Sequence, residues 1–169
     1  VKVMAEAQQQ RITLSHTTLL SATTGKLEVY VLPLWQKRLL LPASAVVEII
    51  SASHIKPTKR NKAVGLLGQV VWEDETIPVV SFEVFNGEAA TPDPQKLAIV
   101  VVATLGEAVQ HFALALQGEP VLNKIKIAEL EDLDNAATGA MEYLQVKYQN
   151  ALCVIPELDA LEEKLHGLL

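Results

Sequence analysis

Short aliphatic runs separated by polar turns recur along this chain and restrict it to a fold built mainly from strands. The run over residues 97–102, Leu-Ala-Ile-Val-Val-Val, is dense in β-branched residues, which favour a strand over a helix. Its expected hairpin partner spans residues 109–117, where Phe112, Leu114 and Leu116 fall on one face. Aromatic residues make up only 5% of the chain, so the core must be aliphatic.

Three more hairpins are expected, each from two short runs that flank a turn pair. The paired runs are 27–34 with 37–41, 69–73 with 76–80, and 142–148 with 152–155. The expected turns are Trp35-Gln36, Asp74-Glu75 and Gln149-Asn150. Pro78 has no amide hydrogen for a strand ladder, so we expect its strand to lie at an edge or a barrel corner there.

Two helices are predicted among these strands. Apolar residues at positions 43, 46, 47 and 50 have the spacing of a short amphipathic helix over Ala43–Ile50. A C-terminal helix is expected after Pro156, with Leu158, Leu161 and Leu165 on one side. The fold class is therefore mainly β and barrel-like, with one short internal helix and a C-terminal helix.

Length and charge bound the organisation and the partners. A chain of 169 residues suits one domain, or two small lobes that share a core. Residues 1–25 are polar and read as a flexible extension, which leaves residues 26–169 as the folded domain. A net charge of -6 argues against nucleic acid as a partner. The apolar runs are too short for membrane insertion, so a cytoplasmic protein is expected.

No catalytic residue, cofactor or metal ligand is assigned. The four histidines are scattered, with neither an HExxH motif nor a Cys/His quartet. Gly65 and Gly68 lack the Lys-Ser/Thr of a phosphate-binding loop, and Ser81 is expected to end a strand or cap a turn. Cys153 lies in an apolar run, where a small buried side chain is the expected role.

Two other classes of function stay open at this point. Trp72 and His111 could line a groove of a small-ligand-binding or enzymatic β-barrel, although burial is favoured for both Trp35 and Trp72. Four basic residues could serve an SH3-like nucleic-acid-binding barrel or contact an acidic partner, but a solvated loop is the favoured reading. These residues are Lys56, Lys59, Arg60 and Lys62.

The elements Val46-Val47-Glu48-Ile49 and Gly68 to Val80 resemble the CheW-like chemotaxis adaptor family in their order and spacing. The resemblance covers roughly residues 26–165. It implies two intertwined, five-stranded SH3-like barrels. It also implies a non-catalytic adaptor that couples the cytoplasmic tips of chemoreceptors to the regulatory domain of a CheA-type histidine kinase.

The chain departs from the family pattern at three points. Glu73-Asp74 stands where the family usually has Arg-Gly, and Ser81 stands where Asp usually follows the proline strand. The later Val-Asp element of the family is also missing, with Ala115-Leu116-Gln117-Gly118 in that region. The first change reverses a charge and removes a forked donor. By resemblance, Val46, Glu48 and Gly68 are interface or geometry positions and Glu73 is a site of altered specificity. The chain looks like a divergent accessory adaptor of a type IV pilus chemosensory system that controls twitching motility.

Overall fold

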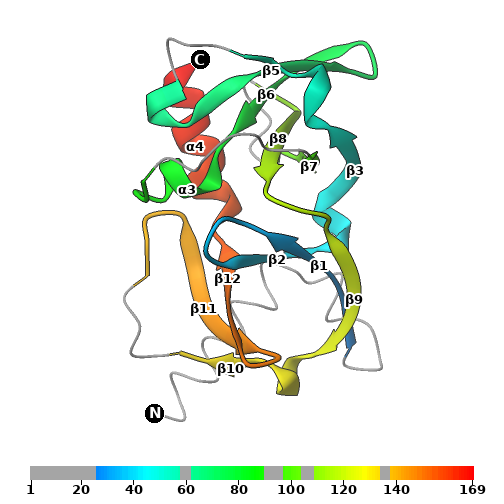
Figure 1. Cartoon of the computed structure of the whole chain (residues 1–169), viewed down its shortest axis with the longest axis vertical. Coiled ribbons are helices and arrows are strands. Elements are labelled where there is room, and N and C mark those ends of the chain that lie inside the picture. The colour runs from blue at the N-terminus through cyan, green and yellow to red at the C-terminus, as the bar shows by residue number, and fades with distance from the viewer. Residues whose placement is uncertain (1–25, 58–61, 90–96, 104–108, 134–137) are drawn as a thin grey trace.

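The computed structural model describes residues 26–57, 62–89, 97–103, 109–133 and 138–169. The expected N-terminal extension, and Lys59 and Arg60 of the basic stretch, lie outside these residues. Two six-stranded sheets form the two ends of the molecule (Figure 1). Among the described residues, no helix is both long and apolar enough to cross a membrane.

The first sheet takes its strands from both ends of the chain. Its order is β10-β11-β12-β2-β1-β9, whereas the second sheet has the order β3-β7-β8-β6-β5-β4. The first sheet contains β1 (Lys26–Pro33), β2 (Arg38–Pro42), β9 (Val121–Lys126), β10 (Glu131–Asp132), β11 (Glu142–Tyr148) and β12 (Ala151–Pro156). The second contains β3 (Val46–Ser51), β4 (Lys56–Pro57), β5 (Leu66–Trp72), β6 (Glu75–Val80), β7 (Leu97–Val102) and β8 (His111–Leu116). The two halves are therefore intertwined.

Both sheets curl on themselves, as hydrogen bonds between distant strands show. Trp72 of β5 donates its indole N–H to Glu48 of β3, although three strands separate β5 from β3 in the sheet order. In the first sheet, Asn123 of β9 donates to the Tyr148 hydroxyl of β11 over 3.3 Å, again across three intervening strands. Curling of this kind gives each sheet an inside and an outside, as in a small barrel.

Three clusters of buried residues make up the core. One fills the inside of the first sheet, with Leu27, Val29, Val146 and Cys153 among its members. A second, rich in alanine and valine, fills the inside of the second sheet. The largest lies between the sheets and includes residues of α3 (Phe82–Phe85) and α4 (Leu158–Leu168), so the helices seal the junction of the two halves.

Most of the expected strands and turns are confirmed. The four predicted hairpins are β1–β2, β5–β6, β7–β8 and β11–β12. Gln149 and Asn150 have φ of 52° and 60°, as a tight hairpin turn requires. At Pro78, β6 pairs with β5 alone, because its pairing with β8 begins at Val79.

The helix expected over Ala43–Ile50 is wrong. Only Ala43–Ala45 forms a 3-10 turn, and Val46–Ser51 is strand β3. The register with β7 shifts between Val46 and Glu48, and β3 is an edge strand with apolar side chains in solvent. The apolar residues of this segment therefore do not form the buried face of a helix.

Three further expectations need correction. Each sheet has six strands and not five. The sequence gives little sign of three of them, because β4 and β10 are only two residues long and β9 carries little apolar alternation. The β5–β6 turn is Glu73-Asp74, one residue earlier than predicted. Trp35 is 54% exposed and not buried, because it lies at the tip of the β1–β2 hairpin.

A buried polar network joins the first sheet to the segment after α3. The Lys37 ammonium lies 3.2 Å from the Glu142 carboxylate and 3.0 Å from that of Glu88. Asn86 donates to both carboxylates and accepts from the backbone N–H of Met141 over 2.9 Å. Nearby, Glu83 of α3 accepts from the backbone N–H of Trp35. The network therefore fixes how the two halves meet.

This network predicts opposite pH effects for its two most buried carboxyls. Burial raises the pKa of Glu142, but hydrogen bonds from Gln145, Gly139 and Asn86 and the charge of Lys37 outweigh it, so the net pKa is lowered. Burial dominates at Glu83 and raises its pKa. The stability from Glu142 is therefore present at neutral pH and lost as pH falls through its lowered pKa. The stability from protonated Glu83 is complete at acid pH and lost as pH rises through its raised pKa.

We expect Glu142→Gln to cost about 1–3 kcal/mol at pH 7, because it weakens a buried charged network, and to cost less towards pH 3. Glu83→Gln removes a buried charge and should gain stability relative to the wild type as pH rises from 4 to 8. Urea unfolding of the wild type and both variants from pH 3 to pH 8 measures the two slopes. Parallel slopes would contradict the assignment of opposite pKa shifts.

Candidate partner-binding surface

The residues that the family resemblance singled out all lie in the second sheet or its β5–β6 turn, but they occupy different surroundings. Strand β3 is its first strand in order and, among the described residues, pairs with β7 alone, so its other edge offers backbone donors and acceptors without a strand partner there. Val47 and Ile49 are exposed on this strand, beside the exposed Glu48. An edge strand with exposed aliphatic side chains is suited to accept a strand from another protein.

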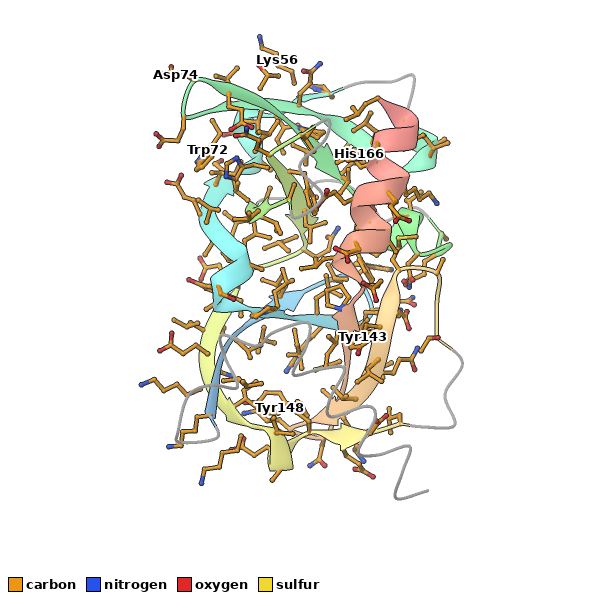
Figure 2. All side chains as sticks on the ribbon, turned by 180° about the vertical axis from the view of Figure 1, so that it is seen from behind. Lys56, Trp72, Asp74, Tyr143, Tyr148 and His166 are labelled. Atoms are coloured by element: carbon orange, nitrogen blue, oxygen red, sulfur yellow. The ribbon has the colours of Figure 1, made fainter. Side chains whose placement is uncertain are left out.

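Val46 and Glu48 differ in their surroundings. Val46 is half-buried and packs against the large cluster between the sheets. Glu48 is exposed, and one of its carboxylate oxygens accepts the indole N–H of Trp72. Figure 2 shows Trp72 beside β3, and the Trp72 ring also packs against the core inside the second sheet. Val46 is therefore anchored in the core, while the Glu48 carboxylate is held at the surface.

Glu73 lies at the tip of the β5–β6 hairpin, next to this strand edge. Glu73 and Asp74 have φ of 50° and 61°, the left-handed conformation that a two-residue hairpin turn requires at both central positions. Figure 2 shows Asp74 at this tip. Both side chains are exposed, so the turn adds two carboxylates directly after Trp72, the residue that contacts Glu48.

Gly68 is placed by backbone geometry. It is buried in β5 opposite Pro57 of β4, and a Cβ atom there would overlap the backbone carbonyl oxygen of Lys56. The structure therefore puts Gly68 inside a close approach of two backbones, away from the exposed edge of β3. Lys56 is exposed on β4, at the same end of the molecule as Asp74 (Figure 2). The backbone of Lys62 lies in a 3-10 turn (Lys62–Val64).

No sequence motif pointed to the contact between His111 and Glu75, which lies next to Trp72. His111 of β8 meets the Trp72 ring edge-on, with ring centroids 5.0 Å apart. Its Nδ1 atom lies 3.0 Å from the Glu75 carboxylate of β6. His111 is the polar residue of an otherwise apolar strand, which is the one sequence signal that could have pointed to it. The two residues named for the alternative ligand groove thus contact each other directly.

The described residues hold no group of three or more His, Cys, Asp or Glu side chains arranged to bind a metal ion. Ser81 caps α3, as its hydroxyl accepts the backbone N–H of Val84 over 3.2 Å. Cys153 is fully buried, and burial raises the pKa of its thiol while the charge of Arg38 opposes this rise. The residues that motif analysis set aside thus have packing and capping roles.

A second apolar edge lies on the first sheet. Strand β9 is the last strand in its order, and within the part of the chain that the structure describes it pairs with β1 alone. Val121 and Leu122 are exposed on it. In Figure 1, β9 and β3 follow one another along the same side of the molecule. This side therefore presents two unpaired strand edges, one from each sheet.

Comparisons with known proteins agree with this architecture. A family model described as the CheW-like domain matches residues 28–163. Among solved structures, the chain is similar to the scaffolding protein TtCheW from Thermoanaerobacter tengcongensis, with a TM-score of 0.64 and 18% sequence identity. The alignment covers 79% of this chain and 90% of that chain. No curated protein matches the sequence.

Proposed function

Because this chain belongs to the CheW-like domain family, a family of non-catalytic scaffolds in chemotaxis signalling, we propose that it couples two signalling partners in the cytoplasm. The partners are the regulatory domain of a CheA-type histidine kinase and the cytoplasmic tips of chemoreceptors. The observation that carries the proposal is the pair of unpaired strand edges, β3 and β9, because a coupling protein needs one surface for each partner.

Both edges have the chemistry of a docking strand. Main-chain groups of an edge strand supply affinity, and alternate side chains supply specificity. On β3 the apolar contacts would come from Val47 and Ile49, and on β9 from Val121 and Leu122. Each edge serves one of the two partners, which allows kinase and receptor to be held at the same time.

Aspartate substitutions on the two edges test this assignment. We expect Ile49→Asp and Leu122→Asp each to weaken binding of one partner at least tenfold, because each buries a charge in an apolar contact. Leu152→Asp is the matched control: Leu152 is 42% exposed, against 38% for Ile49 and 49% for Leu122, but its strand β12 is paired on both sides. Titration calorimetry against each purified partner gives the affinities. Equal losses in all three variants, or no loss on either edge, would contradict the proposal.

The finer role that we propose is that of a divergent accessory adaptor, which works beside a standard one in a chemosensory system controlling type IV pili and twitching. The support is the charge at the β5–β6 turn, where Glu73-Asp74 replaces the Arg-Gly usual in the family. A partner carboxylate that pairs with arginine in standard members would be repelled here. A gene deletion that alters twitching, complemented by the wild-type chain, would support this role, whereas unchanged twitching would oppose it.

A further inference from the structure

A series of side-chain contacts runs inward from the edge strand β3 of the second sheet. Glu48 accepts from the Trp72 indole, the Trp72 ring meets His111 at an interplanar angle of 61°, and His111 pairs with Glu75. The four residues come from β3, β5, β8 and β6, and Glu75 and His111 lie 36 positions apart. Only Glu48 belongs to the positions that the family resemblance marked.

Packing fixes the inner two residues of this series, Trp72 and His111. Trp72 is half-buried and packs against the valine- and alanine-rich core of the second sheet, which restricts its rotamer. His111 is also half-buried, and its contact with Glu75 orients the imidazole against the indole. A donor held in this way fixes the acceptor that it contacts, so Glu48 loses the rotamer freedom that an exposed glutamate normally has.

The charges around Glu48 define the partner chemistry. Besides Glu48, the carboxylates of Glu73, Asp74 and Glu75 lie on the adjoining turn and strand, and His111 contacts that of Glu75. A carboxylate has about four acceptor positions, and the indole N–H of Trp72 takes one. The remaining positions of the exposed Glu48 suit a forked donor such as a guanidinium.

We propose that Trp72 is a positioning residue for partner recognition, which holds the Glu48 carboxylate at the β3 edge for an arginine or lysine of the partner strand. The proposal rests on the function proposed above, because it requires a partner at β3. Fixing Glu48 before binding lowers the entropy cost of forming the ion pair. His111 and Glu75 in turn hold the indole, so they act one step further from the partner.

A double-mutant cycle on the full chain tests the proposal. Glu48→Gln keeps the acceptor but removes the charge, and Trp72→Phe removes the donor but keeps an aromatic ring. Each change is expected to weaken binding of the β3 partner about three- to tenfold, and the double variant should be little worse than either alone. Trp35→Phe is the matched control, because Trp35 is exposed on the other sheet, and should leave the affinity unchanged.

The outcomes separate this proposal from the proposed function. If the wild-type chain binds no kinase or receptor fragment, the proposed function fails. If the wild type binds and Trp72→Phe binds equally well, the positioning role alone fails. Losses that multiply in the double variant would show that Trp72 acts independently of Glu48 and would overturn the proposal.

A spectroscopic readout needs no partner and tests the contact itself. The chain has two tryptophans, so Trp72 is the only indole in a Trp35→Phe background. The edge-on ring contact with His111 is part of the surroundings of this indole, so adding His111→Gln to that background should change the Trp72 emission. An emission spectrum that His111→Gln leaves unaltered would contradict the contact.

Discussion

Phe112→Ala is expected to lower the free energy of unfolding by about 3–5 kcal/mol, the usual cost of emptying a fully buried phenylalanine site. Phe112 of β8 is 1% exposed and belongs to the cluster that lies between the two sheets and the two helices. Neighbours on several elements must move together to fill the cavity, so collapse should be incomplete. Denaturant unfolding followed by circular dichroism measures the loss.

A surface truncation provides the control for this prediction. Val71→Ala removes two carbons from a side chain that is 64% exposed, and should change stability by no more than about 0.5 kcal/mol. If Phe112→Ala cost less than 1 kcal/mol, the two halves would not share the cluster between the sheets. The intertwined arrangement would then need revision.

Gly68→Ala is expected to cost about 2–3 kcal/mol, although it adds a single methyl group. The new Cβ would overlap the backbone oxygen of Lys56 and lie 2.9 Å from its carbonyl carbon. Backbone atoms cannot rotate away as a side chain can, so β4 must separate from β5. Gly167→Ala is the matched control, since nothing lies within 4 Å of a Cβ at this helical position. Alanine should stabilise α4 there by up to about 1 kcal/mol.

Thermal unfolding of both glycine variants, followed by binding of the two partners, separates geometry from recognition. A geometric role at Gly68 predicts a destabilised chain whose remaining folded fraction still binds. Full stability with loss of binding would instead place Gly68 in direct contact with a partner.

Strands with one buried face were predictable from the sequence. In β11, Leu144, Val146 and Tyr148 alternate with more polar residues, and the first set lies in the core of the first sheet. Strand β9 lacked this signal, because Ile125 is its only buried side chain. Strand β3 gave a misleading one, because its edge position exposes apolar residues that a helix would have buried.

The site could be predicted only in part, because the sheet curls. The resemblance marked Glu48 and Glu73, and the structure brings them near each other through Trp72. The contacts of Trp72 with Glu48 and of His111 with Glu75 join residues 24 and 36 positions apart. Neither spacing has a local period. The first contact follows from the curling of the sheet, and the second from the pairing of β6 with β8.

The most direct test of the adaptor role is reconstitution from three purified components. The full chain, the regulatory domain of the CheA-type kinase and a receptor cytoplasmic tip from the same organism would be mixed pairwise and together, then separated by size-exclusion chromatography. We expect kinase and receptor to elute as one complex with this chain, and we expect the complex to fall apart when either strand edge carries its aspartate substitution. Elution of the chain alone, with neither partner bound, would contradict it.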